Sequence, residues 1–198
     1  MAYSVILAHP DPGSFNHALA EVACRALTGL GYEMRFHDLY AEGFDPVLPA
    51  VEIGRDASLP PLLARHCAEA AAAEGFVIVH PNWWGMPPAV LTGWVDRVLR
   101  PGVAYEFLEG DGGEGVPSGL LPANAAVVLN TSNTAAEREA RVFGDPLQRI
   151  WKDCVFGLCG VTNVRRRMFE TVVTSTPAMR RAWLDEASAL VAQTFNPA

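Results

Sequence analysis

Short apolar runs rich in β-branched residues alternate along the chain with segments whose apolar residues recur every three or four positions. The clearest runs are Tyr3–Ala8 and Phe76–His80. Nearly continuous apolar runs of this length are typical of parallel strands that helices cover on both faces. Further strands are predicted at Glu33–Leu39, at Ala125–Asn130 and within residues 161–173. The alternation predicts an α/β protein with a doubly wound five-stranded parallel sheet and helices on both faces.

The intervening segments are predicted to be helices. The first ends near Gly29 or Gly31, and Pro61–Gly75 begins with proline and ends with glycine, as helices commonly do. The others are predicted around residues 90–99, 146–158 and 177–193. The pattern leaves open which of the two common doubly wound strand orders is present. In both orders a ligand binds beyond the carboxyl ends of the strands.

Composition narrows the class of protein. The 198 residues are half hydrophobic, and no linker interrupts them, so we expect a single domain over residues 1–198. A net charge of −7 gives no general attraction to nucleic acid. The four cysteines are scattered and no histidine pair has ligand spacing, so no metal site is predicted. The N-terminal residues do not have the pattern of a signal peptide and no apolar run is long enough to cross a membrane, so we expect a cytoplasmic protein.

The first loop, residues 9–16, reads HPDPGSFN and follows the first strand. Ser14 stands at the expected N-cap of the next helix, where free backbone N–H groups and the helix dipole favour an anion. Capping alone would explain Ser14, but it leaves His9 and Asn16 unexplained. We therefore favour a phosphate site at this loop over an ordinary strand-to-helix turn.

Two more loops follow strands at the same expected edge of the sheet. The second loop, residues 81–88, reads PNWWGMPP, and its adjacent tryptophans cannot both face the core. We expect one tryptophan to pack inward and the other to offer a flat wall to a planar ligand. The third loop, residues 130–134, reads NTSNT and collects short polar side chains that also form plain turns. Together the loops suggest a pocket for a flat, aromatic, phosphorylated ligand.

Two further motifs give only weak signals of nucleotide or phosphate binding. Gly110-x-Gly112-x-x-Gly115 matches the dinucleotide fingerprint, but no strand precedes it and no helix follows it. It falls within Glu109–Gly119, which we interpret as a mobile surface loop. The run Arg165–Arg167 is interpreted as an alternating face of an edge strand rather than as a second phosphate site.

The sequences HPDPGSFNHAL and PNWWGMPPAVLTGWVDRVLRPGVAY resemble the flavodoxin-like NAD(P)H:quinone oxidoreductases, the DT-diaphorase or modulator-of-drug-activity family. The resemblance covers nearly the whole chain. It implies a flavodoxin-like fold with strand order 2-1-3-4-5, a bound flavin (FMN or FAD), NAD(P)H as co-substrate and a homodimer. The residues that the resemblance assigns to the flavin are His9, Ser14, Phe15, Asn16, Pro81, Asn82, Trp83, Trp84, Gly85, Thr131, Ser132, Asn133 and Thr134.

The chain also departs from this family. Asn133 and Thr134 replace two glycines of the family turn, and the stretch AAEREARVFGDP lacks the tyrosine and histidine thought to assist hydride transfer. That proton relay is therefore not carried over. Tyr105 resembles a family tyrosine that reaches the active site near the dimer interface, and it is the catalytic candidate. A plain packing role for Tyr105 is equally compatible with the sequence.

The resemblance implies an enzyme that passes hydride from NAD(P)H through the flavin to a quinone-like acceptor by a ping-pong mechanism, with azo and nitroaromatic acceptors also open. An electron carrier like flavodoxin is a second possibility, although this chain is longer and carries the tryptophan loop. A regulatory partner of a potassium-efflux transporter ranks last, since nothing in the sequence marks a docking surface.

Overall fold

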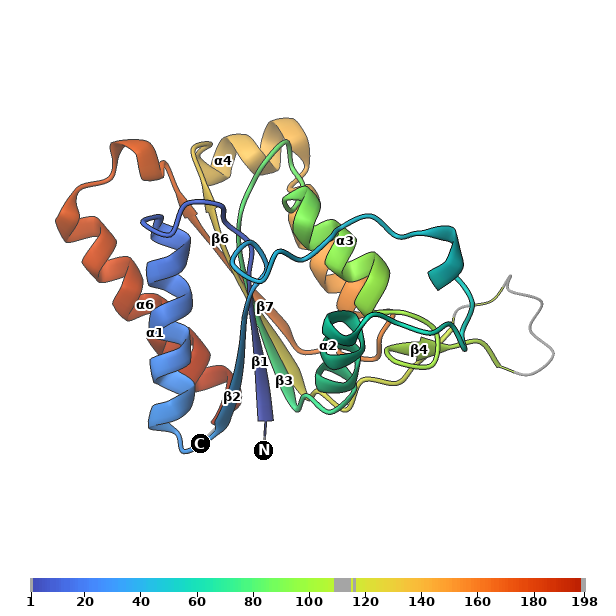
Figure 1. The fold of residues 1–198 in the computed structure, drawn as a ribbon. Helices are drawn as coiled ribbons and strands as arrows, with labels where there is room; N and C mark the ends of the chain where they lie inside the picture. Colours follow the sequence, from blue (N-terminus) through green and yellow to red (C-terminus); the bar gives the residue numbers. More distant parts are fainter. Residues whose placement is uncertain (1, 109–114, 116, 197–198) are drawn as a thin grey trace.

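The computed structural model describes residues 2–108, 115 and 117–196. A five-stranded parallel sheet runs through its centre in the order β2-β1-β3-β6-β7 (Figure 1). The bounds are β1 Ala2–Leu7, β2 Glu33–Asp38, β3 Gly75–Pro81, β6 Ala125–Ser132 and β7 Val164–Glu170. Since β4 and β5 belong to a separate ribbon, this order is the predicted 2-1-3-4-5. The flavodoxin-like doubly wound fold is therefore confirmed.

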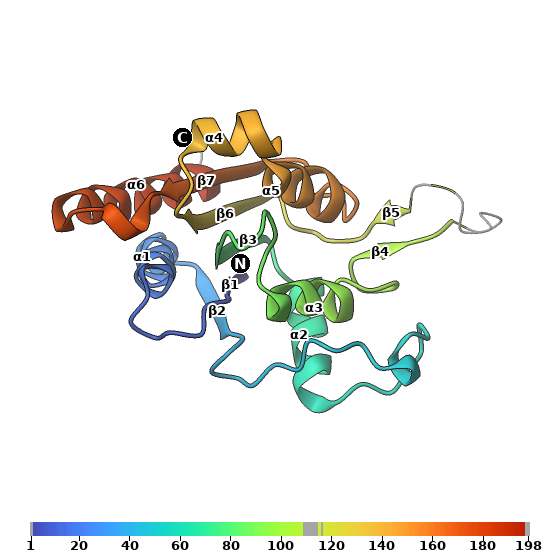
Figure 2. The same ribbon diagram turned by 90° about the horizontal axis from the view of Figure 1, so that it is seen from above.

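Helices cover both faces of the sheet (Figure 2). On one face lie α1, Phe15–Gly29, and α6, Pro177–Phe195. On the other lie α2, α3, α5 and η3, with bounds Pro61–Ala71, Ala89–Val98, Pro146–Arg149 and Ile150–Phe156. Successive strand residues point to opposite faces, so Val77 joins the core beneath α1 and Ile78 the core beneath α3.

The predicted helix at 146–158 is only partly α-helical, because its hydrogen-bond pattern changes to that of a π-helix at Ile150. A short helical segment, α4 (Ala136–Arg138) followed by the π-helix η2 (Glu139–Phe143), was not predicted. It contains too few residues for a periodic apolar stripe. It nevertheless lies directly after β6, beside the expected ligand edge (Figure 2).

A two-stranded ribbon corrects the prediction of a loop at Glu109–Gly119 for its last two residues. There β5, Ser118–Gly119, pairs with β4, Tyr105–Glu106. The ribbon packs closely, because a Cβ at Gly119 would lie 2.2 Å from the backbone nitrogen of Gly160. Residues 109–114 and 116, with most of the rejected dinucleotide motif, lie outside the described residues. Arg165–Arg167 lie on the edge strand β7 as predicted.

The long excursion after β2 is fastened to α3. Arg97 donates from Nε and Nη2 to the Glu52 carboxylate at 2.9 and 2.7 Å, and both side chains are buried. Glu52 belongs to the short 3-10 helix η1, Ala50–Glu52. Gly93 lets the chain approach, since a Cβ there would lie 2.2 Å from the carbonyl oxygen of Pro46. Among the described residues, no helix is both long and apolar enough for a membrane span.

Candidate functional site

A cavity of 360 Å³ opens at the edge of the sheet where β1, β3 and β6 end. We call it the loop-edge cavity. It is lined by the predicted residues His9, Ser14, Phe15, Asn16, Pro81, Asn82, Trp83, Thr131, Ser132, Asn133 and Thr134. The fold therefore brings residues of all three predicted loops to one place, as expected for a parallel sheet.

The first loop is built to leave two backbone donors free. Asp11 holds the turn, because its carbonyl accepts from Ser14 N at 3.0 Å and its carboxylate from Gly13 N at 2.9 Å. Ser14 caps α1 by accepting from the backbone N–H of the third helical residue at 3.4 Å. Within the described chain, the N–H groups of Phe15 and Asn16 have no partner. They point out of the helix start, where the dipole favours a bound anion.

His9 lies beside these donors. Burial lowers the pKa of its imidazole, so the neutral form dominates at neutral pH. Its Nδ1 lies 3.1 Å from the backbone nitrogen of Asp11 and 3.3 Å from the Asp11 carbonyl oxygen. The backbone N–H always carries a proton, so in the shorter contact Nδ1 is the acceptor. The proton of the neutral ring is therefore on Nε2, which makes His9 a donor toward an anion rather than a general acid.

Direct hydrogen bonds hold the loops to one another. The Asn16 side chain donates from Nδ2 to Thr131 Oγ1 at 3.0 Å, and both residues are buried. The backbone N–H of Asn82 donates to the carbonyl of Thr131 at 2.6 Å. Asn133 Oδ1 accepts from the backbone N–H of Val173, which brings the segment after β7 to the cavity. The site is thus a connected frame and not a set of independent turns.

The tryptophan loop differs from the prediction. Neither tryptophan packs inward, because Trp83 is 40% exposed and Trp84 is 97% exposed. Trp83 and Met86 exchange backbone hydrogen bonds across a tight turn, with φ of 60° at Trp84 and 74° at Gly85. This is the left-handed geometry of a type I′ turn, which holds Trp84 at the exposed tip of the loop, whereas Trp83 lines the loop-edge cavity. A tryptophan at positive φ is a rare, strained conformation of the kind that clusters at ligand-binding sites.

Trp84 and Gly85 line a second cavity, of 500 Å³, together with Asn82, Thr134, Glu139, Phe143 and Pro146. We call it the tryptophan cavity, and it shares Asn82 and Thr134 with the loop-edge cavity. Asn82 stands between the two. Its Nδ2 donates to Glu139 Oε1 at 3.0 Å, and its Oδ1 accepts from the backbone N–H of Gly85 at 3.0 Å. A planar ligand in one cavity can therefore extend into the other.

Several lining residues were missed by the sequence reasoning. Glu139 is 3% exposed and comes from the unpredicted π-helix η2, a type of bulge that is frequent at functional sites. Val172, Val173 and Arg180 line the loop-edge cavity from the segment after β7 and from α6. A buried acid in a segment that contains two glutamates, Glu137 and Glu139, carries no distinguishing pattern in the sequence. Arg180, the first arginine in the sequence TPAMRR, looks like any exposed cation on a helix.

Tyr105, the catalytic candidate, is placed elsewhere. It lies on β4 and lines two other cavities, of 470 and 200 Å³, neither of which contains a residue of the three loops. Burial raises the pKa of its phenol. Within one copy of the chain, Tyr105 therefore does not reach the tryptophan cavity.

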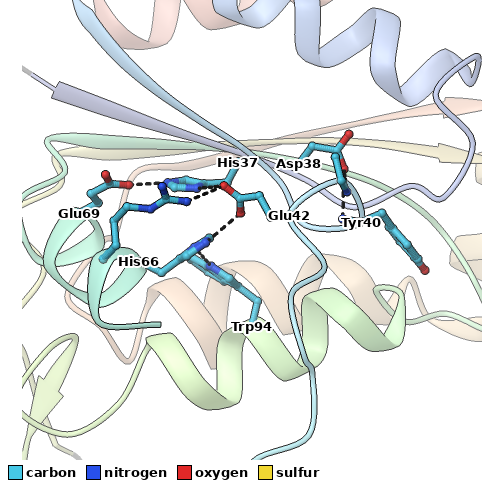
Figure 3. A network of polar contacts seen from close by, with 9 residues as sticks. His37, Asp38, Tyr40, Glu42, His66, Glu69 and Trp94 are labelled. Carbon is cyan, nitrogen blue, oxygen red and sulfur yellow. Dashed lines mark hydrogen bonds and ion pairs between the residues drawn. The ribbon is translucent and has the colours of Figure 1, made fainter. Parts of the chain in front are cut away.

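A buried polar network beside α2 superficially resembles a metal site (Figure 3). His37, Glu42 and His66 place ligand atoms within 4.8 Å of one another. However, His66 Nδ1 accepts from Trp94 Nε1 at 3.0 Å, so its Nε2 carries the proton that faces Glu42 at 2.9 Å. A metal at Nε2 would need that proton removed while the Trp94 donor stayed in place. We interpret the network as a structural link between the end of β2, α2 and α3.

Taken together, the fold and the site define a flavodoxin-like α/β protein whose ligand cavity lies at the strand ends. The chain matches the flavodoxin-like fold family over residues 1–193, and it belongs to that family. The resemblance seen in the sequence is thereby confirmed.

Named relatives are oxidoreductases. An NAD(P)H oxidoreductase of Haemophilus influenzae is 28% identical over 192 residues, which cover 95% of this chain and 93% of that protein. The human ribosyldihydronicotinamide dehydrogenase [quinone] is 28% identical over 74% of this chain and 71% of its own length. The match to NAD(P)H dehydrogenase [quinone] 1 of Cavia porcellus, at 30% identity, covers 52% of this chain and 44% of that protein.

Solved structures agree on the fold. An NAD(P)H:quinone oxidoreductase from Methanothermobacter marburgensis superposes with a TM-score of 0.81 at 22% identity, covering 100% of this chain and 98% of that one. An FMN-dependent NADH-azoreductase from Bacillus anthracis, solved with FMN, has a TM-score of 0.78 at 15% identity, covering 99% and 100%. At these identities the likeness establishes the fold.

Proposed function

We propose that the protein is a flavin-dependent NAD(P)H oxidoreductase that reduces quinone-like acceptors. The observation that carries this proposal is the loop-edge cavity, where three loops place unpaired anion-binding N–H groups next to an aromatic turn. The names of the relatives, NAD(P)H oxidoreductases and quinone dehydrogenases, support the same reaction class.

The residues present fit a flavin phosphate. The free N–H groups of Phe15 and Asn16, the Nε2–H of His9 and the hydroxyl of Ser14 would hold it. Arg180 adds a cation to the same cavity, and its guanidinium is already anchored by Ser175 Oγ at 2.8 Å. This end of the site therefore offers donors to the phosphate of FMN or of FAD.

The other end fits a planar ring. Pro81, Asn82 and the tryptophan turn would line one side of the isoalloxazine, and residues Thr131–Thr134 the edge. When bound, the flavin supplies the hydride chemistry. The protein orients the ring, and the side chains of Trp84, Phe143 and Pro146 offer apolar contacts to an aromatic acceptor. One cavity that takes NAD(P)H and then the acceptor implies ping-pong kinetics, with azo and nitroaromatic acceptors as further candidates.

We also propose a cytoplasmic homodimer. All four cysteines are free, which is typical of a reducing compartment. Exposed apolar side chains gather on and near the β4–β5 ribbon, at Phe107, Leu108 and Leu120. A second copy that covers this face would give Tyr105 access to a partner's flavin, and a catalytic role for Tyr105 depends on that arrangement.

Steady-state kinetics test the proposal. Purified protein supplied with FMN or FAD should oxidise NADH or NADPH only when a simple quinone is present, and double-reciprocal plots should be parallel. A carrier like flavodoxin would need a separate reductase. Failure to gain either activity or thermal stability from added flavin would contradict the proposed function.

A further inference from the structure

Ser14, His17 and Asp38 form a continuous chain of hydrogen bonds behind the loop-edge cavity. His17 Nδ1 lies 2.9 Å from Ser14 Oγ, and His17 Nε2 lies 3.0 Å from Asp38 Oδ2. The three residues come from the first loop, α1 and β2. Ser14 lines the cavity, whereas His17 and Asp38 stand behind it with side chains that are 20% and 16% exposed.

The backbone fixes the orientation of Asp38. Its Oδ1 accepts from the N–H groups of Tyr40 and Ala41, both at 3.1 Å, which leaves Oδ2 for His17 (Figure 3). The neighbouring His37 points to the opposite face of the sheet, into the α2 network, because side chains alternate along a strand. Asp38 is therefore available to a single histidine.

This geometry sets the direction of each proton. A carboxylate can only accept, so neutral His17 must carry its proton on Nε2. Its Nδ1 is then an acceptor, and the Ser14 hydroxyl proton points to His17, away from the cavity. If His17 is protonated, Nδ1–H donates to Ser14 Oγ instead. The serine hydroxyl proton is then released to face a ligand in the cavity.

The charges around His17 favour protonation once an anion is bound. Asp38 from β2 is in direct contact. The loop contributes Asp11 and the neutral His9, whose ring centre is 6.4 Å away, and α6 contributes Arg180 across the cavity. A phosphate dianion at the N-terminus of α1 would add negative charge next to Ser14 and offset the opposing Arg180 charge.

We propose that His17 is a positioning residue that takes up a proton when a flavin phosphate binds, and thereby turns the Ser14 hydroxyl toward the phosphate. The proton comes from solvent and bridges Nδ1 and Ser14 Oγ, and no covalent bond to the flavin forms or breaks. This inference rests on the proposed function, since it assumes that the loop-edge cavity binds the flavin phosphate. It predicts that, at pH values where the FMN phosphate is a dianion, the affinity for FMN rises as pH falls, because His17 takes up a proton on binding.

The variant Asp38→Asn tests the proton uptake at His17. The N–H groups of Tyr40 and Ala41 would keep the amide oxygen of the new side chain, so its NH₂ would face His17 Nε2. His17 would then accept at Nε2 and, still neutral, donate from Nδ1 to Ser14. The serine hydroxyl would be free without an added proton. Asp38→Asn should therefore bind FMN but without proton uptake at His17.

Calorimetric titration of the apoprotein in buffers of different ionisation enthalpy measures this uptake. At about pH 8 the FMN phosphate is already a dianion, so the phosphate itself takes up no proton on binding. Wild type should take up close to one proton per FMN and none with riboflavin, which lacks the phosphate. Asp38→Asn should take up close to none. The matched control Asp45→Asn, which alters another aspartate that accepts from a backbone N–H, should behave as wild type.

Two results would overturn the inference. One is FMN binding to wild type without proton uptake. The other is equal uptake by wild type and Asp38→Asn, which would place the proton on His9 or elsewhere. Failure of every protein, wild type included, to bind either FMN or riboflavin would instead contradict the proposed function itself.

Discussion

Gly85 is the position where the structure makes its sharpest prediction about the ring-binding turn. Its φ is +74°, and a Cβ built there would lie 2.8 Å from Pro146 Cγ. Gly144 is a matched control, because its φ is +73° and nothing lies within 4 Å of its Cβ position. The substitutions Gly85→Ala and Gly144→Ala thus share the backbone strain and differ in the steric clash.

The two contributions can be estimated separately. Placing an L side chain in the left-handed region costs about 1 kcal/mol, so both variants should lose this amount of unfolding free energy. Overpacking against a rigid proline ring adds roughly 1–3 kcal/mol in Gly85→Ala alone. The turn or α5 must also shift to relieve the clash. Trp84 then moves with the turn, so we expect the affinity for FMN to fall by about tenfold, or ~1.4 kcal/mol, in this variant only.

Urea unfolding and titration of the apoprotein with FMN, followed by flavin fluorescence, test both estimates. Gly144→Ala should lose about 1 kcal/mol of unfolding free energy and keep the wild-type Kd. Equal losses of stability and unchanged FMN binding in both variants would refute the reasoning. They would show that the contact with Pro146 neither constrains the turn nor positions Trp84.

Three further predictions concern the same loops and the core beneath them. Trp84→Ala should change the unfolding free energy by less than about 0.5 kcal/mol, because the ring is exposed, yet weaken flavin binding several-fold. A variant that binds flavin as tightly as wild type would show that the Trp84 ring does not contact the flavin. Asn16→Ala should lower the unfolding free energy by about 1–3 kcal/mol, because buried Thr131 Oγ1 loses its hydrogen-bond donor. An unchanged urea-unfolding curve would show that this hydrogen bond does not stabilise the contact between the loops. Burial lowers the pKa of His66 and of His80 to about 4, from 6.5 in the unfolded chain. Between these values the unfolded state binds more protons, so stability should fall with falling pH by roughly 1.4 kcal/mol per pH unit for each histidine, and a flat urea-unfolding profile there would contradict it.

Much of the fold follows from patterns that repeat along the chain. The strand Phe76–His80 and the helix beginning at Pro61 were predictable because apolar period and helix-start chemistry are local properties. The π-helices at Glu139–Phe143 and Ile150–Phe156 were not, since a π-helical hydrogen-bond pattern has no residue signature of its own in the sequence. The β4–β5 ribbon depends likewise on a contact between Gly119 and the distant Gly160.

Some features of the candidate site could likewise be predicted from the sequence, and others could not. Loops that follow buried strands must meet at one sheet edge, which is why His9, Asn82 and Thr131 could be grouped from sequence. The exposed position of Trp84 could not, because it depends on left-handed φ values at Trp84 and Gly85. Glu139 and Arg180 reach the cavities from segments that carry no ligand-binding pattern.

The central claim is that the three loops form a flavin site, and the most direct test is to identify what the purified protein carries. Protein purified without added cofactor is denatured, and the released small molecules are identified by mass and by their visible spectrum. The structure predicts FMN or FAD, approaching one per chain after reconstitution, with loss of binding when the first-loop donors are disrupted. A colourless protein that releases no flavin and binds none when FMN or FAD is added would contradict the account.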